Sequence, residues 1–303
     1  MINATRGRAM ILLFMGRSVE SREAIEHALE VFNASAETDQ IAARAAGQDA
    51  GVAILALTSW VLWVLGHVDT AVSRMAAALE RADRVHHAHT QAYACYYASV
   101  LHALRGEPAI AQGYAERCLA ISEQHGFRQW LGLSRAIRGV CTAALDVSGS
   151  RLDEVVAALE EYQRAGYQLG ITAQFALLSS ALLLRSEPEA ALEAIDHGLT
   201  IVNDNDERFL AAELYRLKAR TLLARGAAND EAEILLDRAL QTARSQQARS
   251  LELRAATDLA KFWMNKGQRA EALDLLSPIY GSLTEGFDTQ DLKDAKTLLA
   301  ELS

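Results

Sequence analysis

Apolar residues recur three and four positions apart through long stretches of this chain, and short breaks separate the stretches. LRAATDLAKFWMNK (253–266) and GQRAEALDLL (267–276) are two such stretches, with Gly267 at the break between them. This period is typical of amphipathic helices, and glycine favours a tight reversal because it has no Cβ. The pattern predicts two antiparallel helices that meet at Gly267 and pack against each other along their apolar stripes.

The same break recurs about 40 residues apart, which is the period of a repeat protein made of helix pairs. The breaks fall at Gly66, Gly106, Gly149, Ser186, Gly226 and Gly267. Small residues seven apart, such as Ala71 and Ala78, follow several breaks and would let a neighbouring helix approach closely. One pair cannot bury its apolar face alone, so the pairs are expected to stack. The sequence predicts an all-α superhelix, a solenoid of antiparallel helix pairs.

The expected elements make up a single solenoid over residues 1–303. The first helix of each pair, helix A, is expected near 51–65, 90–105, 128–145, 168–185, 208–225 and 250–266. The second, helix B, is expected near 69–84, 107–124, 151–165, 187–202, 229–246 and 268–284. These six repeats cover 51–286. Before them, 1–50 is interpreted as a partial repeat with an insertion at 34–48; after them, 287–303 is interpreted as a capping helix.

The composition and net charge of the chain argue against some classes of binding partner. Half of the 303 residues are apolar and only three are proline, which suits a helical protein with a large core. The net charge of −9 argues against nucleic acid or an anionic membrane. The apolar run at 51–66 is too short for a membrane span. Three cysteines without paired spacing suggest buried thiols in the reducing cytoplasm.

Motifs for catalysis are absent from the sequence. It contains no phosphate-binding loop, dinucleotide fingerprint, nucleophile turn or HExxH pair. The segment RVHHAHTQAYAC brings His86, His87, His89 and Cys95 together, but it lies at an expected turn, where exposed histidines are ordinary. We therefore predict a protein that is not an enzyme and that binds neither a metal nor a cofactor.

One set of side chains on helices A suggests a binding surface. In helical-hairpin solenoids helix A lines the concave wall, so equivalent positions form a row across the groove. Arginine forks bind carboxylates and tyrosine rings anchor peptides. Positions nine to fourteen residues before the breaks predict a groove lined by Tyr93, Tyr97, Arg135, Arg138, Gln174, Arg216 and Arg254.

A purely structural role remains an open alternative for the arginines of this set and also for the tryptophans of helices A. The arginines would pair with Glu213 and Glu252 on adjacent helices and merely stabilise the stack. The tryptophans on the apolar stripes of helices A would pack in the core rather than form an aromatic ligand cage; they are Trp60, Trp63, Trp130 and Trp263.

The chain also resembles known repeat proteins. The sets Gly66/Ala71/Ala78 and Gly226/Ala232/Ala239 resemble the skeleton of tetratricopeptide (TPR) repeats, with a longer period. The segments 47–53 (GQDAGVA), 212–220 (AELYRLKAR), 250–260 and 266–302 resemble the C-terminal TPR-like region of multidomain bacterial signalling proteins. In those proteins a class III adenylate/guanylate cyclase or DNA-binding domain precedes a signal-transduction ATPase module. The resemblance implies a regulatory array that binds a partner or inducer.

No catalytic residue carries over from that resemblance, because neither cyclase carboxylates nor an ATPase phosphate loop precede the repeats here. The expected function is that of a cytoplasmic, non-catalytic scaffold of a bacterial signalling system that binds a protein segment in its groove. An ATPase or cyclase module is one possible partner. Two alternatives are a module that senses a small inducer and a fragment that self-assembles into a homo-oligomer through its N-terminal end.

Overall fold

The computed structural model describes residues 2–35, 47–146, 152–226 and 229–303. Within these ranges every regular element is a helix, so the predicted all-α class is confirmed. Most of the expected insertion at 34–48 and the expected break at Gly149 lie outside the described residues.

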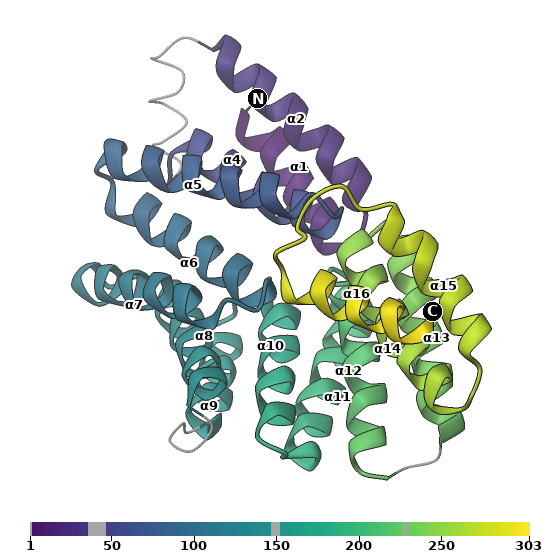
Figure 1. Cartoon of the computed structure of the whole chain (residues 1–303). Coiled ribbons are helices and arrows are strands. Elements are labelled where there is room, and N and C mark those ends of the chain that lie inside the picture. The colour runs from purple at the N-terminus through teal and green to yellow at the C-terminus, as the bar shows by residue number, and fades with distance from the viewer. Residues whose placement is uncertain (1, 36–46, 147–151, 227–228) are drawn as a thin grey trace.

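Six helices form the inner layer of the superhelix (Figure 1). They correspond to the predicted helices A, and each packs against the next along the chain. Their bounds are α4 Ala50–Val64, α6 Ala88–Leu104, α8 Arg128–Leu145, α10 Ile171–Leu184, α12 Ala211–Ala224 and α14 Arg249–Asn265.

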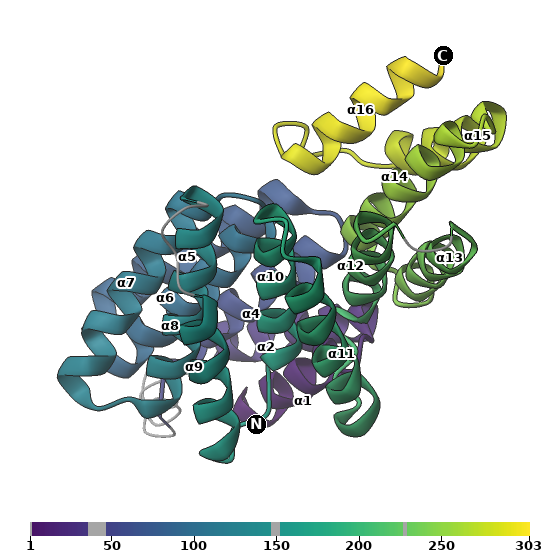
Figure 2. The ribbon, with the colours of Figure 1, turned by 90° about the horizontal axis from the view of Figure 1, so that it is seen from below.

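Six further helices lie outside this layer, each packed against its inner partner, as Figure 2 shows most clearly for α7 and α13. They correspond to the predicted helices B. Their bounds are α5 Val68–Val85, α7 Pro108–His125, α9 Leu152–Arg164, α11 Pro188–Asn205, α13 Asn229–Ser245 and α15 Arg269–Gly281. The last helix, α16 (Gln290–Leu302), packs against α14 and α15.

The N-terminal segment forms a helix pair of its own. Whereas the sequence suggests a partial repeat, α1 (Ile2–Phe14) and α2 (Ser18–Ala34) pack against each other and against α4. Gly16 makes the turn with a φ of 75°, as at the later breaks. Ser21 Oγ donates a hydrogen bond of 2.7 Å to the carbonyl of Ala9, and this bond joins the two helices. Residues 2–34 therefore add a helix pair to the start of the array.

Helices α10 and α12 begin three residues later than the sequence predicts, and contacts with distant residues explain both shifts. The carboxylate of Glu207 accepts hydrogen bonds from the backbone N–H groups of Gly170 (3.0 Å) and Thr172 (2.9 Å), and so caps α10. The N–H groups of Arg208 and Phe209 donate to the carbonyl of Phe14, at 2.7 and 3.0 Å, instead of starting α12.

The core runs through the inner layer, whose helices are covered on both sides. In α4 every residue except Leu55 is buried, which explains its long apolar run. The small residues after the breaks, including Ala71, Ala78, Ala232 and Ala239, are fully buried. The three cysteines are buried and free. In the part of the chain that the structure describes, we find no helix with the length and hydropathy of a membrane span.

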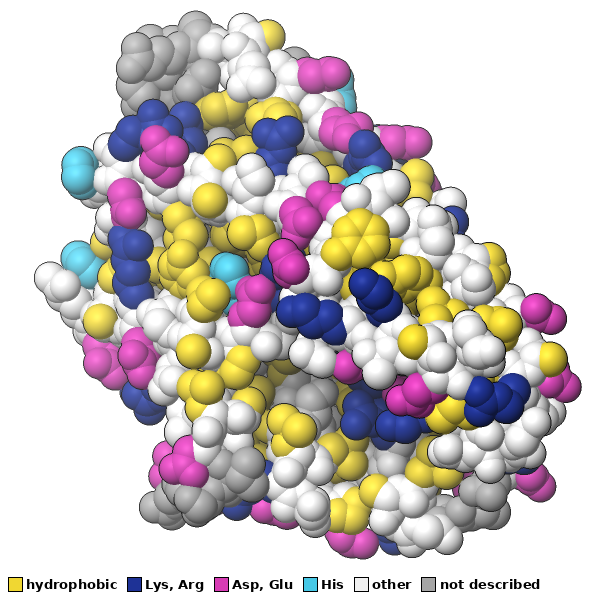
Figure 3. All heavy atoms as spheres, in the orientation of Figure 1, with side chains coloured by type: hydrophobic (Ala, Val, Ile, Leu, Met, Phe, Trp, Pro, Cys, Tyr) yellow, Lys and Arg dark blue, Asp and Glu magenta, His cyan; other side chains and the backbone are white. Residues whose placement is uncertain are grey.

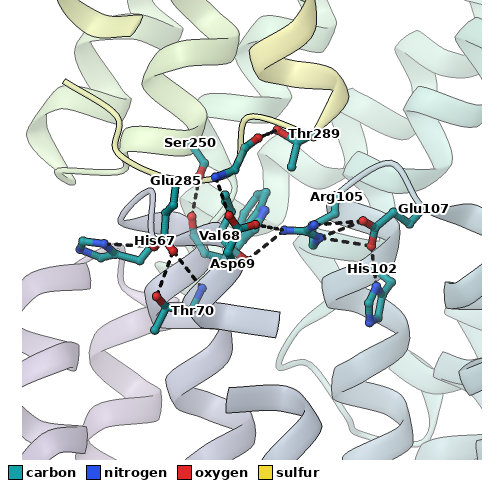
Figure 4. Close-up of polar contacts among 12 residues, drawn as sticks. His67, Val68, Asp69, Thr70, His102, Arg105, Glu107, Ser250, Glu285 and Thr289 are labelled. Carbon is teal, nitrogen blue, oxygen red and sulfur yellow. Dashed lines mark hydrogen bonds and ion pairs between the residues drawn. The ribbon is translucent and has the colours of Figure 1, made fainter. Parts of the chain in front are cut away.

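The superhelix returns on itself, because the loop between α15 and α16 reaches the turn between α4 and α5 (Figure 4). Glu285 Oε2 accepts hydrogen bonds from Thr70 N (3.1 Å) and Thr70 Oγ1 (2.9 Å). Asp69 Oδ2 accepts one from Gly286 N at 2.9 Å. A Cβ on Gly286 would lie 2.0 Å from Val68, so only glycine permits this approach. We call this set of residues (67–70 with 285–286) the closure contact.

Two neighbouring interactions extend the closure contact along the inner layer. Ser250 Oγ on α14 donates to the carbonyl of Trp63 on α4 at 2.5 Å. The Arg105 guanidinium, at the end of α6, donates to the carbonyl of Val68 at 2.9 Å. The first and last repeats of the inner layer are therefore joined directly, and the curved wall encloses the space on its inner side.

Candidate functional site

A cavity of about 450 Å³ opens on the concave side of the inner layer. Its walls come from α8, α10, α12, α14 and α16 and from the turn between α6 and α7. Figure 3 shows the hollow below α16, with apolar and basic side chains at its edges. We call it the central cavity.

The wall formed by α8 and α10 is apolar. Leu184 is 61% exposed at the rim, although leucine is usually buried. Ala181 and Leu177 lie one and two turns earlier on the same helix, and Val140 and Cys141 on α8 extend this surface. Such a wall can bury an apolar side chain of a ligand.

The opposite wall, from α12, α14 and α16, is charged. Arg216 binds the carboxylate of Glu213 through two hydrogen bonds of 2.7 and 2.8 Å, and its third nitrogen lies 2.5 Å from Asp258 Oδ2. Arg254 lies 3.2 Å from Glu213 Oε1 and donates to Asp291 Oδ2 at 2.8 Å. Arg254 also donates to the carbonyl of Leu104 on α6. We call these five charged residues the Glu213 network.

Glu213 stays ionised at the centre of this network. Burial by itself raises the pKa of its carboxyl, but the Arg216 and Arg254 guanidiniums outweigh that effect and lower the pKa to about 2. Both arginines are therefore compensated by carboxylates of the chain itself. The interpretation that these arginines pair within the stack holds for Glu213, whereas Glu252 instead binds Arg244 and Arg249.

Arg220 is the charged side chain best placed to bind a ligand. It lies one turn after Arg216, is exposed, and takes part in none of the hydrogen bonds or ion pairs found among the described residues. It also lines an adjoining cavity of about 390 Å³ between α12 and α14, where Lys261 and Lys266 lie. The two cavities share Arg220 and Asp258 and together present an apolar side and a charged side.

The seven residues predicted to line one groove lie in three different places. Arg216 and Arg254 reach the central cavity. Tyr93 and Tyr97 line a separate cavity near the N-terminal ends of the inner helices, and Gln174 is fully buried beside it. The last two lie on the surface of α8: Arg135, 3.8 Å from Glu123, and the exposed Arg138.

Some residues that line the central cavity lie closer to the breaks than the predicted window, and this explains why the sequence prediction did not include Arg220. Arg220 lies six residues before Gly226, whereas the predicted window began nine residues before each break. Ser180 and Lys261 hold the same position before Ser186 and Gly267, and each lines a concave cavity. The concave surface therefore extends along the inner helices from positions such as Arg216 and Arg254 to positions nearer the breaks. The segment AELYRLKAR contains Arg220, so the repeat alignment would have found it with a wider window.

The histidine-rich segment has structural roles. His87 Nδ1 lies 2.8 Å from Thr90 Oγ1 and caps α6, and His89 Nε2 accepts a hydrogen bond of 3.1 Å from Trp130 Nε1. Cys95 is buried farther along α6. Across the described ranges, no three potential metal-ligating side chains lie close enough to share an ion.

The stacked helix pairs and their concave cavity define a TPR-like α-solenoid. The solved structure of NprR in complex with its cognate peptide NprX is similar, with a TM-score of 0.59 at 12% identity over 99% of this chain and 82% of that chain. A Rap protein complexed with competence and sporulation factor gives a TM-score of 0.54 at 11% identity, over 100% and 99% of the two chains. The apo form of RapI gives 0.55 at 12% identity, over 99% of each chain.

These likenesses concern the fold. No protein-family model matches the chain, and no curated protein matches it in sequence.

Proposed function

We propose that this chain is a non-catalytic regulatory scaffold that binds a peptide or an extended protein segment in its central cavity. The carrying observation is the pairing of an apolar wall at Leu184 and Leu177 with the exposed Arg220, which forms no ion pair among the described residues, on the opposite side. A peptide offers both partners, since an apolar side chain fits the wall and a carboxylate fits the guanidinium fork.

The structural neighbours support this assignment. NprR binds its cognate peptide and a Rap protein binds competence and sporulation factor, and each aligns with nearly the whole of this chain. The resemblance to the TPR-like regions of bacterial signalling proteins supports a place in a signalling system. We propose an ATPase or cyclase module of such a system as the source of the bound segment.

A selection from a library of random nine-residue peptides tests the proposal. We expect the full chain to enrich peptides that combine an acidic group with apolar residues. Arg220→Glu and Leu184→Asp should each weaken binding of the selected peptides at least tenfold, because the first repels the carboxylate and the second removes the apolar contact.

Arg74→Glu is the matched control, because it makes the same charge change at an exposed position on the outer helix α5. It should leave binding unchanged. Failure to enrich any peptide, or equal binding by the Arg220 and Arg74 variants, would refute the proposal.

A further inference from the structure

A second cavity, of about 240 Å³, lies on the inner layer away from the peptide site. It is bounded by α1, α4, α6, α8 and the end of α9, and its polar residues Gln48, His89 and Gln129 are only partly buried. We call it the aromatic cavity. Its volume is below the range of about 300–1,000 Å³ that drug-sized ligands occupy, so it suits a smaller molecule of one or two rings.

Aromatic rings form the walls of this cavity in a fixed arrangement. Tyr93 and Tyr97 stack with centroids 4.3 Å apart, and Tyr97 stacks on Trp60 at 4.4 Å. Trp130 stands perpendicular to Tyr93, with centroids 5.7 Å apart and an interplanar angle of 89°. These contacts between rings hold the aromatic wall of the cavity in place.

The charge of the lining favours an anion. Arg6 lines the cavity, and no carboxylate is present among its described lining residues. Arg6 Nε is buried, and no described side chain or backbone group accepts a hydrogen bond from it. A buried donor without an acceptor costs about 1–3 kcal/mol, which a carboxylate at that point would offset.

Hydrogen bonds within the chain already occupy two other polar groups at this cavity. Tyr162 Oη donates to the carbonyl of Leu169 at 2.9 Å, and Gln174 Nε2 donates to Tyr96 Oη at 3.0 Å. Burial raises the pKa of Tyr93 well above its usual range, although the nearby Arg6 opposes this, so its hydroxyl keeps its proton. The Nε of Arg6 is therefore a positively charged donor with unused capacity for an anionic ligand.

We propose that the aromatic cavity binds a small planar aromatic carboxylate, with its ring against the aromatic wall and its carboxylate on Arg6. The ligand is chemically unlike the peptide of the central cavity and occupies different residues. This site would give the scaffold a second, small-molecule input. Ligand binding in the aromatic cavity does not depend on whether the central cavity binds a peptide.

Calorimetric titration of the full chain with indole-3-acetate tests this site. We expect saturable binding of indole-3-acetate, at least tenfold weaker binding of the neutral indole-3-acetamide, and no measurable binding of the cationic tryptamine. Arg6→Gln should weaken indole-3-acetate at least tenfold. Arg8→Gln, at an exposed position on the same helix, should not change it.

A second variant tests the cavity itself. Leu133→Trp places a larger side chain in the space that Leu133 lines and should abolish binding. Circular dichroism and thermal melting check that the variant folds. If that variant does not fold, the comparison of Arg6→Gln with Arg8→Gln decides the question. The proposal is wrong if wild-type protein does not bind indole-3-acetate, if tryptamine binds equally well, or if Arg6→Gln binds as the wild type does.

Discussion

Glu213 shows how a single buried charge can organise the concave wall. Its carboxylate accepts hydrogen bonds from Arg216 on its own helix and from Arg254 on the next inner helix. A buried ion pair contributes little stability in itself, but removal of one partner leaves the others buried without compensation. The Glu213 network therefore holds α12 and α14 in a fixed relation beside Arg220.

Replacement of Glu213 by glutamine should lower the free energy of unfolding at pH 7 by about 3 kcal/mol, because Arg216 and Arg254 lose their shared counter-charge. The folded-state pKa of Glu213 is lowered to about 2, so its contribution is complete above its usual pKa and is lost as the pH falls toward 2. Urea unfolding between pH 5 and pH 2 should show a weaker pH dependence in the variant.

The control for this experiment is Glu80→Gln, at an exposed carboxyl on the outer helix α5. It should reproduce both the stability and the pH profile of the wild type. An unchanged slope between pH 5 and pH 2 in Glu213→Gln would mean that this carboxyl does not titrate abnormally in the folded protein.

At the scale of the elements, the turns inside the helix pairs share one backbone conformation. Gly66, Gly106, Gly226 and Gly267 have φ values between 71° and 91°, and Ser186 adopts 60° at the corresponding place. This left-handed region is unfavourable for residues with a Cβ. Of these five turn residues Ser186 is the one with a Cβ, so its left-handed backbone conformation is strained.

Ser186→Gly should raise the free energy of unfolding by about 0.5–1 kcal/mol, since relief of backbone strain exceeds the added entropy of the unfolded chain. Gly267→Ser should lower it by a similar amount. A Cβ at Gly267 would meet no atom within 4 Å, so its effect isolates the backbone conformation. Thermal and urea unfolding of the two variants measure both changes, and a destabilised Ser186→Gly would contradict the argument.

The helix pairs could be predicted from the sequence because their signals are local. The apolar period and the breaks lie within each 40-residue unit, and Gly66 and Gly267 mark turns in the structure as expected. The starts of α10 and α12 could not be predicted, because Glu207 caps the first and the carbonyl of Phe14 holds the second. Such contacts join residues far apart in the sequence.

The candidate site was only partly predictable for a related reason. Arg216 and Arg254 line the central cavity, but Tyr93 and Tyr97 line a different one. Repeat alignment gives the helix face and the position along each helix. It does not give the point at which curved helices converge, which depends on the packing of the whole array.

For the whole molecule, the closure contact distinguishes this superhelix from an open array. In an open array each repeat contacts its neighbours alone, and the ends move apart freely. Here Asp69 and Glu285 join residues more than 200 positions apart. The closure contact therefore helps to fix the curvature that shapes the central cavity, in addition to the packing between neighbouring repeats.

The double variant Asp69→Ala/Glu285→Ala should open the superhelix. We expect a larger radius of gyration in small-angle X-ray scattering and weaker binding of peptides selected on the wild-type protein, because the cavity walls separate. Glu80→Ala/Glu271→Ala removes two exposed carboxyls from α5 and α15 and serves as the control. An unaltered scattering profile in the Asp69/Glu285 variant would show that packing alone sets the curvature.

The closure contact also limits how such a chain can evolve. Open arrays gain or lose units by duplication and deletion, because any unit fits beside any other. In this chain an added unit of about 40 residues would carry Gly286 away from Val68, whose close approach excludes every side chain. We therefore expect homologous chains that keep the closure contact to keep the same number of repeats.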